Sequence, residues 1–193
     1  MNSLPAQPIL ETKRLLLKEL NPDIIDALFS TGSDVDIISF LGLPGVEALE
    51  TEKTNWQQGL TTFKISFKKF LIAEKETNKF VGRCDFHTWH IMHRRAEIGY
   101  AITDETLKGK GYMSEALRAV IAFGFDKMQL NRIEAFTGKS NIPSLQLLKN
   151  IGFTEEGTLR SHYFKNGVIE DSVCFSLLQP EYGAIKGSWF DKL

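Results

Sequence analysis

Short runs of hydrophobic residues, each bounded by polar residues, mark the N-terminal half of the chain. Residues 14–20 predict a strand, and Asn21-Pro22-Asp23 directly after them predicts the start of a helix, because proline is favoured in the first helical turn. Residues 70–74 and 80–86 are two further apolar runs separated by a polar turn, which is typical of a β-hairpin. Residues 33–60, before this hairpin, are less periodic and predict only one short helix, over residues 50–59.

The middle of the chain places a strand, a glycine-containing turn and a helix in close succession. Residues 96–103 predict the strand. Small and apolar residues then recur at spacings of three and four over residues 113–124, which puts one stripe on a single helical face. Residues 132–137 predict another strand. A strand, a helix and a strand in this order predict a right-handed crossover between parallel strands.

Beyond the crossover, the pattern predicts one more helix and a pair of strands. The helix begins near Asn141 and ends at Gly152, a favourable C-terminal cap. Residues 157–160 and 171–178 predict strands that are joined through the turn Asn166-Gly167. The fold class that follows is α/β with a mixed sheet.

Length and composition agree with one globular unit. With 193 residues, 42% of them hydrophobic and 24% charged, the chain suffices for one well-filled core, so we expect a single domain over residues 1–193. A formal net charge of -1 without a basic block argues against a nucleic-acid partner. Cys84 and Cys174 form no paired motif, no apolar run reaches the about 20 residues of a membrane helix, and no signal pattern opens the chain. We therefore expect a cytoplasmic protein without a membrane partner.

The sequence Lys108-Gly109-Lys110-Gly111-Tyr112 connects the central strand to the central helix. A turn before a helix exposes unpaired N–H groups at the positive end of the helix dipole, and glycine lets a ligand approach the backbone closely. Two lysines add positive charge beside these N–H groups. Residues 108–113 are therefore predicted to form a pyrophosphate site. The dinucleotide fingerprint and the P-loop both fail to match, because Ser114 stands where a third glycine is needed and no Gly-Lys-Ser/Thr occurs. The alternative is a tight turn with no ligand.

These residues resemble the GNAT acetyltransferases, and within them the RimJ/RimL-type protein N-terminal acetyltransferases. The resemblance covers about residues 10–180, and the order and spacing of its motifs are more specific than any single motif. In chain order, the motifs are Thr12-Lys13-Arg14-Leu15-Leu16-Leu17, Ile98-Gly99-Tyr100, Gly109-Lys110-Gly111-Tyr112-Met113-Ser114-Glu115-Ala116, Asn141-Ile142-Pro143-Ser144, Gly152-Phe153, Glu156-Gly157-Thr158-Leu159-Arg160, Asn166-Gly167 and Asp171.

The resemblance implies a splayed, mostly antiparallel sheet with a central parallel strand pair, flanked by helices. It also implies that acetyl-CoA is the cofactor and that its pantetheine arm enters the opening. The arm would pair there with the backbone of Tyr100, Ile102 and Thr103. The thioester would end near Asn141 and Ser144. One position departs from the family pattern, because Thr106 stands where the acyl-CoA signature usually begins with Arg or Gln.

Acetyl transfer to an amine requires a proton acceptor for the amine and a proton donor for the leaving thiolate. Glu97, beside the splay, is the candidate base, with an exposed strand carboxylate as the alternative. The resemblance places Ser144 near the sulfur and Asn141 as a hydrogen-bond partner, while both can also be plain helix caps. Leu148 replaces the family's usual general-acid tyrosine, and Tyr163 is the candidate substitute, with a packed strand aromatic as the alternative.

Three histidines, His87, His90 and His93, are equally spaced near a turn. Steps of three residues on a strand alternate between its two faces, and no nearby cysteine completes a tetrahedral set. We therefore expect solvated loop histidines and no metal site.

The expected reaction is direct transfer of an acetyl group to a primary amine in a ternary complex. Keeping an α-amine neutral at pH 7 costs about 1 kcal/mol, against about 4.6 kcal/mol for a lysine, which favours a protein N-terminus as acceptor, with a ribosomal protein as one candidate. A polyamine, an aminoglycoside or an amino-acid analogue stays an alternative, because residues 33–63 and the loop around Tyr163 determine acceptor choice. A non-catalytic acyl-CoA-binding module is the alternative from a different class. The resemblance also implies a homodimer.

Overall fold

The computed structural model describes residues 9–57, 68–165 and 167–190, which contain one eight-stranded sheet. The strand order is β1-β2-β3-β4-β5-β6-β8-β7, and all neighbours are antiparallel except β5 and β6. The strands are β1 (Ile9–Glu11), β2 (Leu15–Leu20), β3 (Lys68–Glu74), β4 (Phe80–His90), β5 (Arg95–Ile102), β6 (Arg132–Gly138), β7 (Thr154–Lys165) and β8 (Val168–Leu178).

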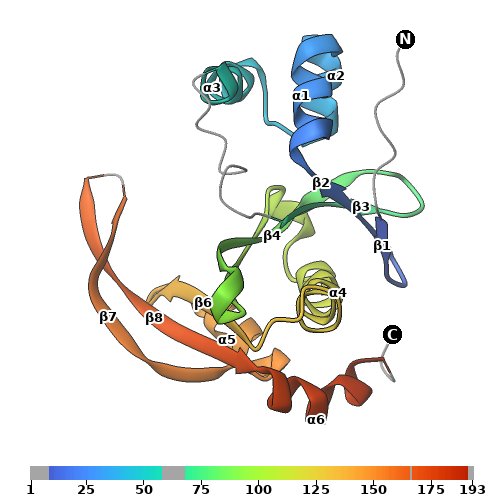
Figure 1. Ribbon diagram of the computed structural model, residues 1–193. Coiled ribbons are helices and arrows are strands. Elements are labelled where there is room, and N and C mark those ends of the chain that lie inside the picture. The colour runs from blue at the N-terminus through green and yellow to red at the C-terminus, as the bar shows by residue number, and fades with distance from the viewer. Residues whose placement is uncertain (1–8, 58–67, 166, 191–193) are drawn as a thin grey trace.

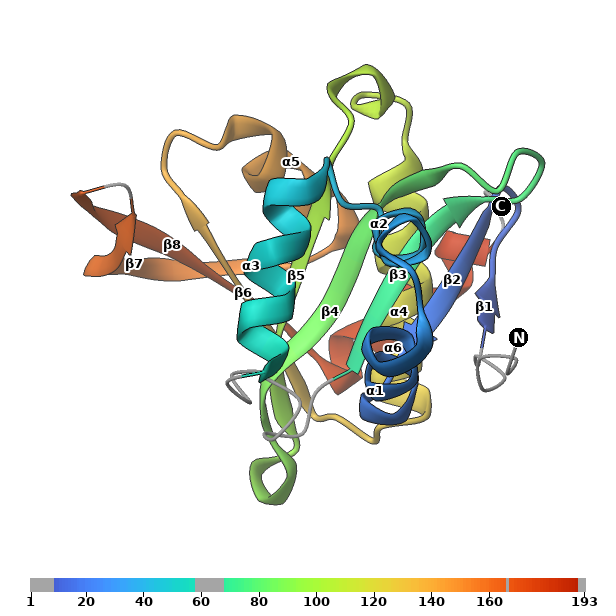
Figure 2. The same cartoon turned by 90° about the horizontal axis from the view of Figure 1, so that it is seen from above.

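Helices cover both faces of this sheet. The first three lie together on one face, and the long fourth helix lies against the opposite face (Figure 1, Figure 2). The helices are α1 (Pro22–Thr31), α2 (Asp34–Leu41), α3 (Val46–Gln57), α4 (Tyr112–Asp126), α5 (Ile142–Ile151) and α6 (Gln179–Phe190). The arrangement confirms the expected α/β class.

The apolar stripe of α4 organises the main core. Val120 and Ile121 are fully buried and belong to one cluster with Phe86 of β4 and Ile98 of β5. Burying a side chain of this size contributes about 1.5–3 kcal/mol, so the cluster strongly favours one placement of the helix. The first turn of α4 is thereby fixed relative to β4 and β5.

The parallel strands β5 and β6 pair over a short length only. Their paired residues are Arg95 with Arg132, Ala96 with Ile133 and Glu97 with Glu134. β5 continues to Ile102 and β6 to Gly138, so the two strands separate beyond Glu97. We call this point of separation the fork. It confirms the expected splayed sheet, and the chain passes from the end of β6 almost directly into α5.

Residues 33–57 contain more helix than the sequence pattern predicts. α2 was not predicted, because its eight residues bury only Ile37 and give little periodicity. Its start carries a capping box, in which Ser33 Oγ accepts from the Asp36 N–H and the Asp36 carboxylate accepts from the Ser33 N–H. α3 begins at Val46 instead of residue 50, and the predicted helix end at residue 59 lies outside the described residues.

The C-terminal hairpin is longer than predicted, and one helix follows it that was not predicted. β7 and β8 project away from the rest of the sheet (Figure 1). Asn166 of the predicted turn lies outside the described residues, while Gly167 has a φ of 80°. In α6, Tyr182 is buried, stacks on Phe125 of α4 at 4.7 Å and donates to Asp126. The short edge strand β1 was also not predicted.

Candidate active site

The glycine turn before α4 presents free backbone N–H groups. Gly109 and Gly111 have φ of 73° and 80°, in the left-handed region that glycine favours, and Gly111 directly precedes α4. The Glu115 N–H bonds to the Gly111 carbonyl, so helical hydrogen bonding starts at that residue. Within the described ranges, no carbonyl or side chain accepts from the N–H groups of residues 109–114. These donors lie at the positive end of the helix dipole, which suits an anion.

An ion pair from the turn between β1 and β2 holds the glycine turn in place. The buried carboxylate of Glu115 accepts from Thr12 Oγ1 at 2.6 Å, from the Arg14 N–H at 2.8 Å and from Arg14 Nε at 2.7 Å. Burial alone would raise the pKa of Glu115, but these hydrogen bonds outweigh it and lower the pKa. Arg14 also donates to the Lys110 carbonyl at 3.0 Å and lies over the Tyr112 ring. The Thr12-to-Arg14 motif therefore buttresses the glycine turn.

Replacing Arg14 with alanine is expected to weaken acetyl-CoA binding. The Lys110 carbonyl and the Tyr112 ring lose their contact, and the buried Glu115 carboxylate loses its charged partner, which costs about 1.5–3 kcal/mol. We expect a roughly fivefold to tenfold higher Kd, with a lower melting temperature. Calorimetry with acetyl-CoA measures the first and thermal unfolding the second. The matched control is Lys13→Ala, which removes an exposed neighbour; a folded R14A protein with an unchanged Kd would contradict this role.

The two lysines of the turn differ in their environment. Lys108 Nζ lies 2.5 Å from Glu105 Oε1, so its charge is already paired, which the sequence interpretation did not anticipate. Lys110 is exposed, and its carbonyl is held by Arg14. Thr106, at the position that departs from the family pattern, donates from both its N–H and its hydroxyl to Asp104. The guanidinium of Arg14 is therefore the cation that the sequence interpretation missed beside this turn.

Two hydroxyl groups meet between β5 and α5. Tyr100 Oη and Ser144 Oγ lie 2.6 Å apart, and burial raises the pKa of Tyr100 to about 12, so the phenol keeps its proton at neutral pH. Asn141 Oδ1 accepts from the Ser144 N–H at 3.3 Å and caps α5. Leu148, where the resemblance expects a tyrosine, is completely buried in the core and supplies no proton.

The remaining predicted cofactor residues have different surroundings. Ile102 ends β5 beyond the fork, where that strand is no longer paired with β6. The Thr103 N–H donates to the Val81 carbonyl at 3.4 Å, toward β4. Tyr112 donates from Oη to Glu74, while Met113 is buried in the main core. Ile102 thus lies at the open end of β5, and the Thr103 N–H is engaged within the protein, whereas Tyr112 contacts β3 and Met113 packs in the core.

Two of the predicted catalytic residues meet on the other face of the sheet. Glu97 is the last residue of β5 that pairs with β6, and its carboxylate is largely buried. Tyr163 reaches it from β7, with Oη donating to Glu97 Oε1 at 3.4 Å. Three residues along a strand place Glu97 and Tyr100 on opposite faces. The Glu97–Tyr163 pair and the Tyr100–Ser144 pair therefore lie on the two sides of the fork.

The histidine interpretation is wrong for His87. It lies on β4 opposite Glu97, with Nε2 3.0 Å from Glu97 Oε1 and Nδ1 3.4 Å from Asp85 Oδ2. The second contact is too poorly aligned for a good hydrogen bond, so it is mainly ionic. The Asp85 and Glu97 carboxylates raise the pKa of His87 to about 9. His90 and His93 are exposed, with their rings 6.2 Å apart.

A second carboxylate beside Glu97 is already neutralised. Glu134 of β6 pairs with Glu97 in register and accepts from Arg95 Nη1 and Arg132 Nε, each at 2.8 Å. Arg132 also forms a bidentate pair with Glu156 of β7. The two arginines thus leave little negative charge on the β6 side of the fork.

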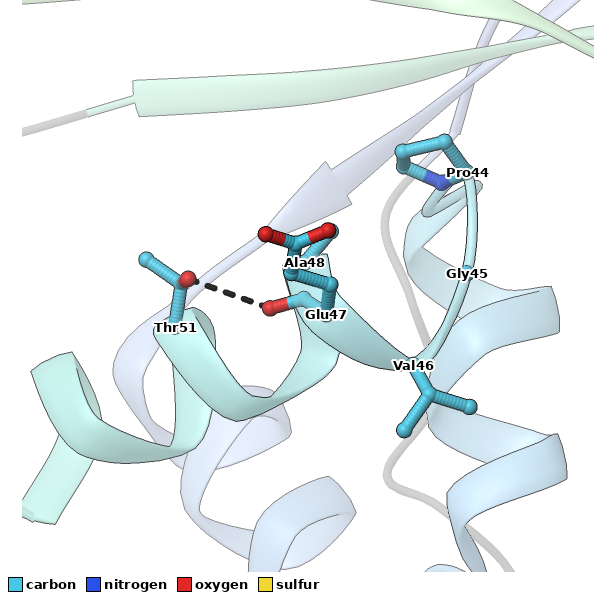
Figure 3. Close-up of a pocket in the computed structure, with 6 residues that line it drawn as sticks. All are labelled: Pro44, Gly45, Val46, Glu47, Ala48 and Thr51. Atoms are coloured by element: carbon cyan, nitrogen blue, oxygen red, sulfur yellow. Dashed lines mark hydrogen bonds between the residues drawn. The ribbon is translucent and has the colours of Figure 1, made fainter.

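A surface hollow of about 390 Å³ lies at the start of α3 (Figure 3). It is lined by Pro44, Gly45, Val46, Glu47, Ala48 and Thr51. Thr51 Oγ1 donates to the Glu47 carbonyl at 3.1 Å (Figure 3). None of its lining residues is a predicted site residue, but the hollow belongs to the region expected to influence acceptor choice.

Across the part of the chain that the structure describes, no group of three or more His, Cys, Asp and Glu side chains is arranged to hold a metal ion. Among the same residues, no helix has both the length and the apolar character needed to cross a membrane.

A fork between parallel strands, next to a helix that begins on free backbone amides, is the arrangement of an acetyltransferase fold. The acetyltransferase (GNAT) domain matches residues 14–154, so the chain belongs to the GNAT family of acetyltransferases. It is an N-acetyltransferase, an enzyme of a family that generally uses acetyl-CoA.

Relatives by sequence support this assignment, and a solved structure shares the fold. The chain is 33% identical over 178 residues to a Bacillus subtilis protein named "Uncharacterized N-acetyltransferase YoaA", covering 90% of this chain and 98% of that one. It is 37% identical over 101 residues to "Putative ribosomal N-acetyltransferase YdaF" of the same species, covering 52% and 55%. The spermidine/spermine N-acetyltransferase SpeG of Vibrio cholerae superposes with a TM-score of 0.66 at 19% identity, over 89% of this chain and 96% of that one.

Proposed function

We propose that this N-acetyltransferase is of the RimJ/RimL type and transfers the acetyl group of acetyl-CoA to the α-amine of a protein N-terminus, as a single domain over residues 1–193. The observation that carries the acceptor class is the charge around the fork. Asp85 and Glu97 share one histidine, whereas Glu134 and Glu156 are paired with arginines. Lys69 lies opposite Asp85 in the β3–β4 register and offsets part of its charge, so little negative charge is left for an incoming cation, which matches one ammonium group better than a polyamine.

The residues present fit acetyl-CoA. The N–H groups of residues 109–114 have no acceptor within the described part of the chain, so a pyrophosphate would satisfy them. Arg14 and Lys110 add positive charge at the turn, and the fork leaves the β5 edge open near Tyr100 and Ile102. Asn141 and Ser144 at the start of α5 would lie beside the thioester end.

Acetyl-CoA, when bound, supplies the thioester carbonyl that the amine nitrogen attacks; the N–C bond forms and the C–S bond breaks. The amine approaches the fork from the face opposite the Tyr100–Ser144 pair. Glu97 accepts the amine proton, because its largely buried carboxylate lies at the fork on that face. Tyr163 contacts Glu97 from β7 and helps to orient the amine. Ser144, hydrogen-bonded to the protonated Tyr100, would donate a hydrogen bond to the sulfur as the C–S bond breaks, in place of the tyrosine that Leu148 replaces.

The named relatives point in two directions. The Bacillus subtilis relative YdaF carries a name that refers to ribosomal acetylation, and this supports a protein N-terminus, with a ribosomal protein as a candidate partner. SpeG carries a name that refers to spermidine and spermine, and this supports a small polyamine acceptor as the second candidate. The carboxylates at the fork favour the first, since most of them already have a cation of their own.

An acceptor panel separates the candidates. We expect thiol release from acetyl-CoA with short peptides that carry a free α-amine, and at least tenfold lower kcat/KM with spermidine, spermine and an aminoglycoside. The matched control is the same peptide with an acetylated N-terminus and a free lysine side chain, which the enzyme is expected to leave unmodified. A preference for polyamines would reverse the acceptor assignment. Saturable acetyl-CoA binding with no turnover in any arm would instead support a non-catalytic acyl-CoA-binding module.

A further inference from the structure

The imidazole of His87 lies between two carboxylates, on the face of the sheet that carries Glu97. Nε2 is 3.0 Å from Glu97 Oε1, and Nδ1 is 3.4 Å from Asp85 Oδ2. The three side chains come from two neighbouring cross-strand pairs, because His87 faces Glu97 and Asp85 faces Gly99 in the β4–β5 register. His87 Nδ1 is buried and lacks an aligned hydrogen-bond acceptor, so its contact with Asp85 is ionic.

Gly99 provides the space in which this ring lies. A Cβ added at Gly99 would stand 2.8 Å from His87 Cε1, closer than side chains tolerate, and 3.3 Å from Nδ1. Any other residue at this position would force the imidazole to shift from its place beside Glu97. The glycine of the Ile98-Gly99-Tyr100 motif is therefore tied to the placement of His87.

We propose that His87 is a positioning residue for the acetyl transfer, which holds the Glu97 carboxylate at the fork through Nε2 while Asp85 anchors the other side of the ring. This inference rests on the proposed function of Glu97 as the proton acceptor. With Oε1 of Glu97 held by His87, Oε2 is the oxygen left to accept the proton of the amine. Among the described residues, Thr88 Oγ1 contacts Oε2 at 3.4 Å.

The arrangement requires the ring to be doubly protonated. A neutral imidazole has one N–H, so one of its two carboxylate neighbours would face a nitrogen lone pair and be repelled. The groups that face this site are Asp85 from β4, Glu97 from β5 and Tyr163 from β7. Lys69 of β3 lies opposite Asp85, and burial lowers its pKa; because it does not touch the imidazole, its titration would persist in a variant that lacks His87. The two carboxylates keep the pKa of His87 near 9, so the ring is charged at neutral pH. As the pH rises through about 9, His87 loses its second proton and its hold on Glu97 weakens.

The test compares His87→Gln with the parent enzyme, using a peptide α-amine acceptor. Such an amine has a pKa of about 7.8, so it is already neutral above pH 9, and a fall in kcat centred near pH 9 then reports another group. Burial and the Glu97 carboxylate keep the pKa of Tyr163 above its ordinary value, so this phenol does not titrate in that window. We expect the fall in the parent and its absence in H87Q.

The size and the kind of loss are also specified. H87Q is expected to lower kcat about tenfold to 100-fold, because the proton acceptor is no longer held in place, while the Kd for acetyl-CoA stays within twofold. The matched control is His90→Gln, which changes an exposed histidine of the same strand and should keep the parental profile. Gly99→Ala, which displaces the ring without removing it, should reproduce the H87Q profile.

A second readout is independent of turnover. The imidazole carbon resonance of His87 should titrate near pH 9 in the parent and at a clearly lower pH in Glu97→Gln. A parent that acetylates peptides while H87Q keeps the parental kcat and pH profile would overturn the positioning role and leave the proposed function intact. A parent that acetylates no amine would overturn the proposed function, and this inference with it. Those two failures are therefore distinguishable.

Discussion

Gly111→Val is expected to raise the Kd for acetyl-CoA by about tenfold to 100-fold. A β-branched residue in the left-handed region costs about 1–2 kcal/mol, and Gly111 has a φ of 80° directly before α4. The added side chain also meets Arg14, because a Cβ at Gly111 would already lie 3.4 Å from Arg14 Nη2. The turn must change its backbone to relieve both problems, and its N–H groups then no longer converge on one anion. Calorimetric titration with acetyl-CoA measures the loss.

The control for G111V is a glycine substitution without these constraints. Gly187 lies in α6, has an ordinary backbone and leaves open space where a Cβ would be placed. Gly187→Ala should bind acetyl-CoA like the parent and be slightly more stable, since alanine favours a helix by up to about 1 kcal/mol. If G111V is folded and binds acetyl-CoA with the parental Kd, the turn is not the anion site.

Local patterns in the sequence predicted the elements that carry the proposed cofactor site. The stripe over residues 113–124 specified the buried face of α4, and the two glycines specified a turn that needs positive φ. Both signals arise within one element, so they survive folding unchanged. α2 and α6 carry no such local signal and were not predicted. α2 is short, and α6 packs through Tyr182 on Phe125 and Asp126 of a helix more than 50 residues earlier.

The partners of the charged site residues were not predictable from local patterns. Glu115 follows its partner Arg14 by about a hundred positions, and only the packing of α4 against β2 brings them together. His87 meets Glu97 through the β4–β5 register, which a run of alternating residues does not specify. Its spacing to the other histidines suggested a solvated loop, whereas the pairing across the hairpin gives it two acidic neighbours.

Glu97→Gln is expected to lower kcat about 100-fold or more while acetyl-CoA binding is retained. Glutamine keeps the shape of the side chain and can still contact His87 and Tyr163, but it cannot accept a proton from the amine. General-base catalysis of this kind typically contributes about 10²–10⁴ in rate. The change lies on the face of β5 opposite Tyr100, so the cofactor site should be unaffected. Steady-state kinetics with a peptide acceptor, paired with calorimetry, measures both quantities.

The control for E97Q is Glu134→Gln, in the residue paired with Glu97 across the fork. The two carboxylates have similar exposure, 13% and 14%, but Glu134 is occupied by Arg95 and Arg132 and does not contact Tyr163. E134Q is expected to lose some stability, because two arginines lose their partner, while kcat changes by less than about threefold. Equal losses of kcat in both variants would mean that the charge of this face matters and not a specific proton acceptor. An E97Q enzyme with parental kcat would remove Glu97 from the reaction altogether.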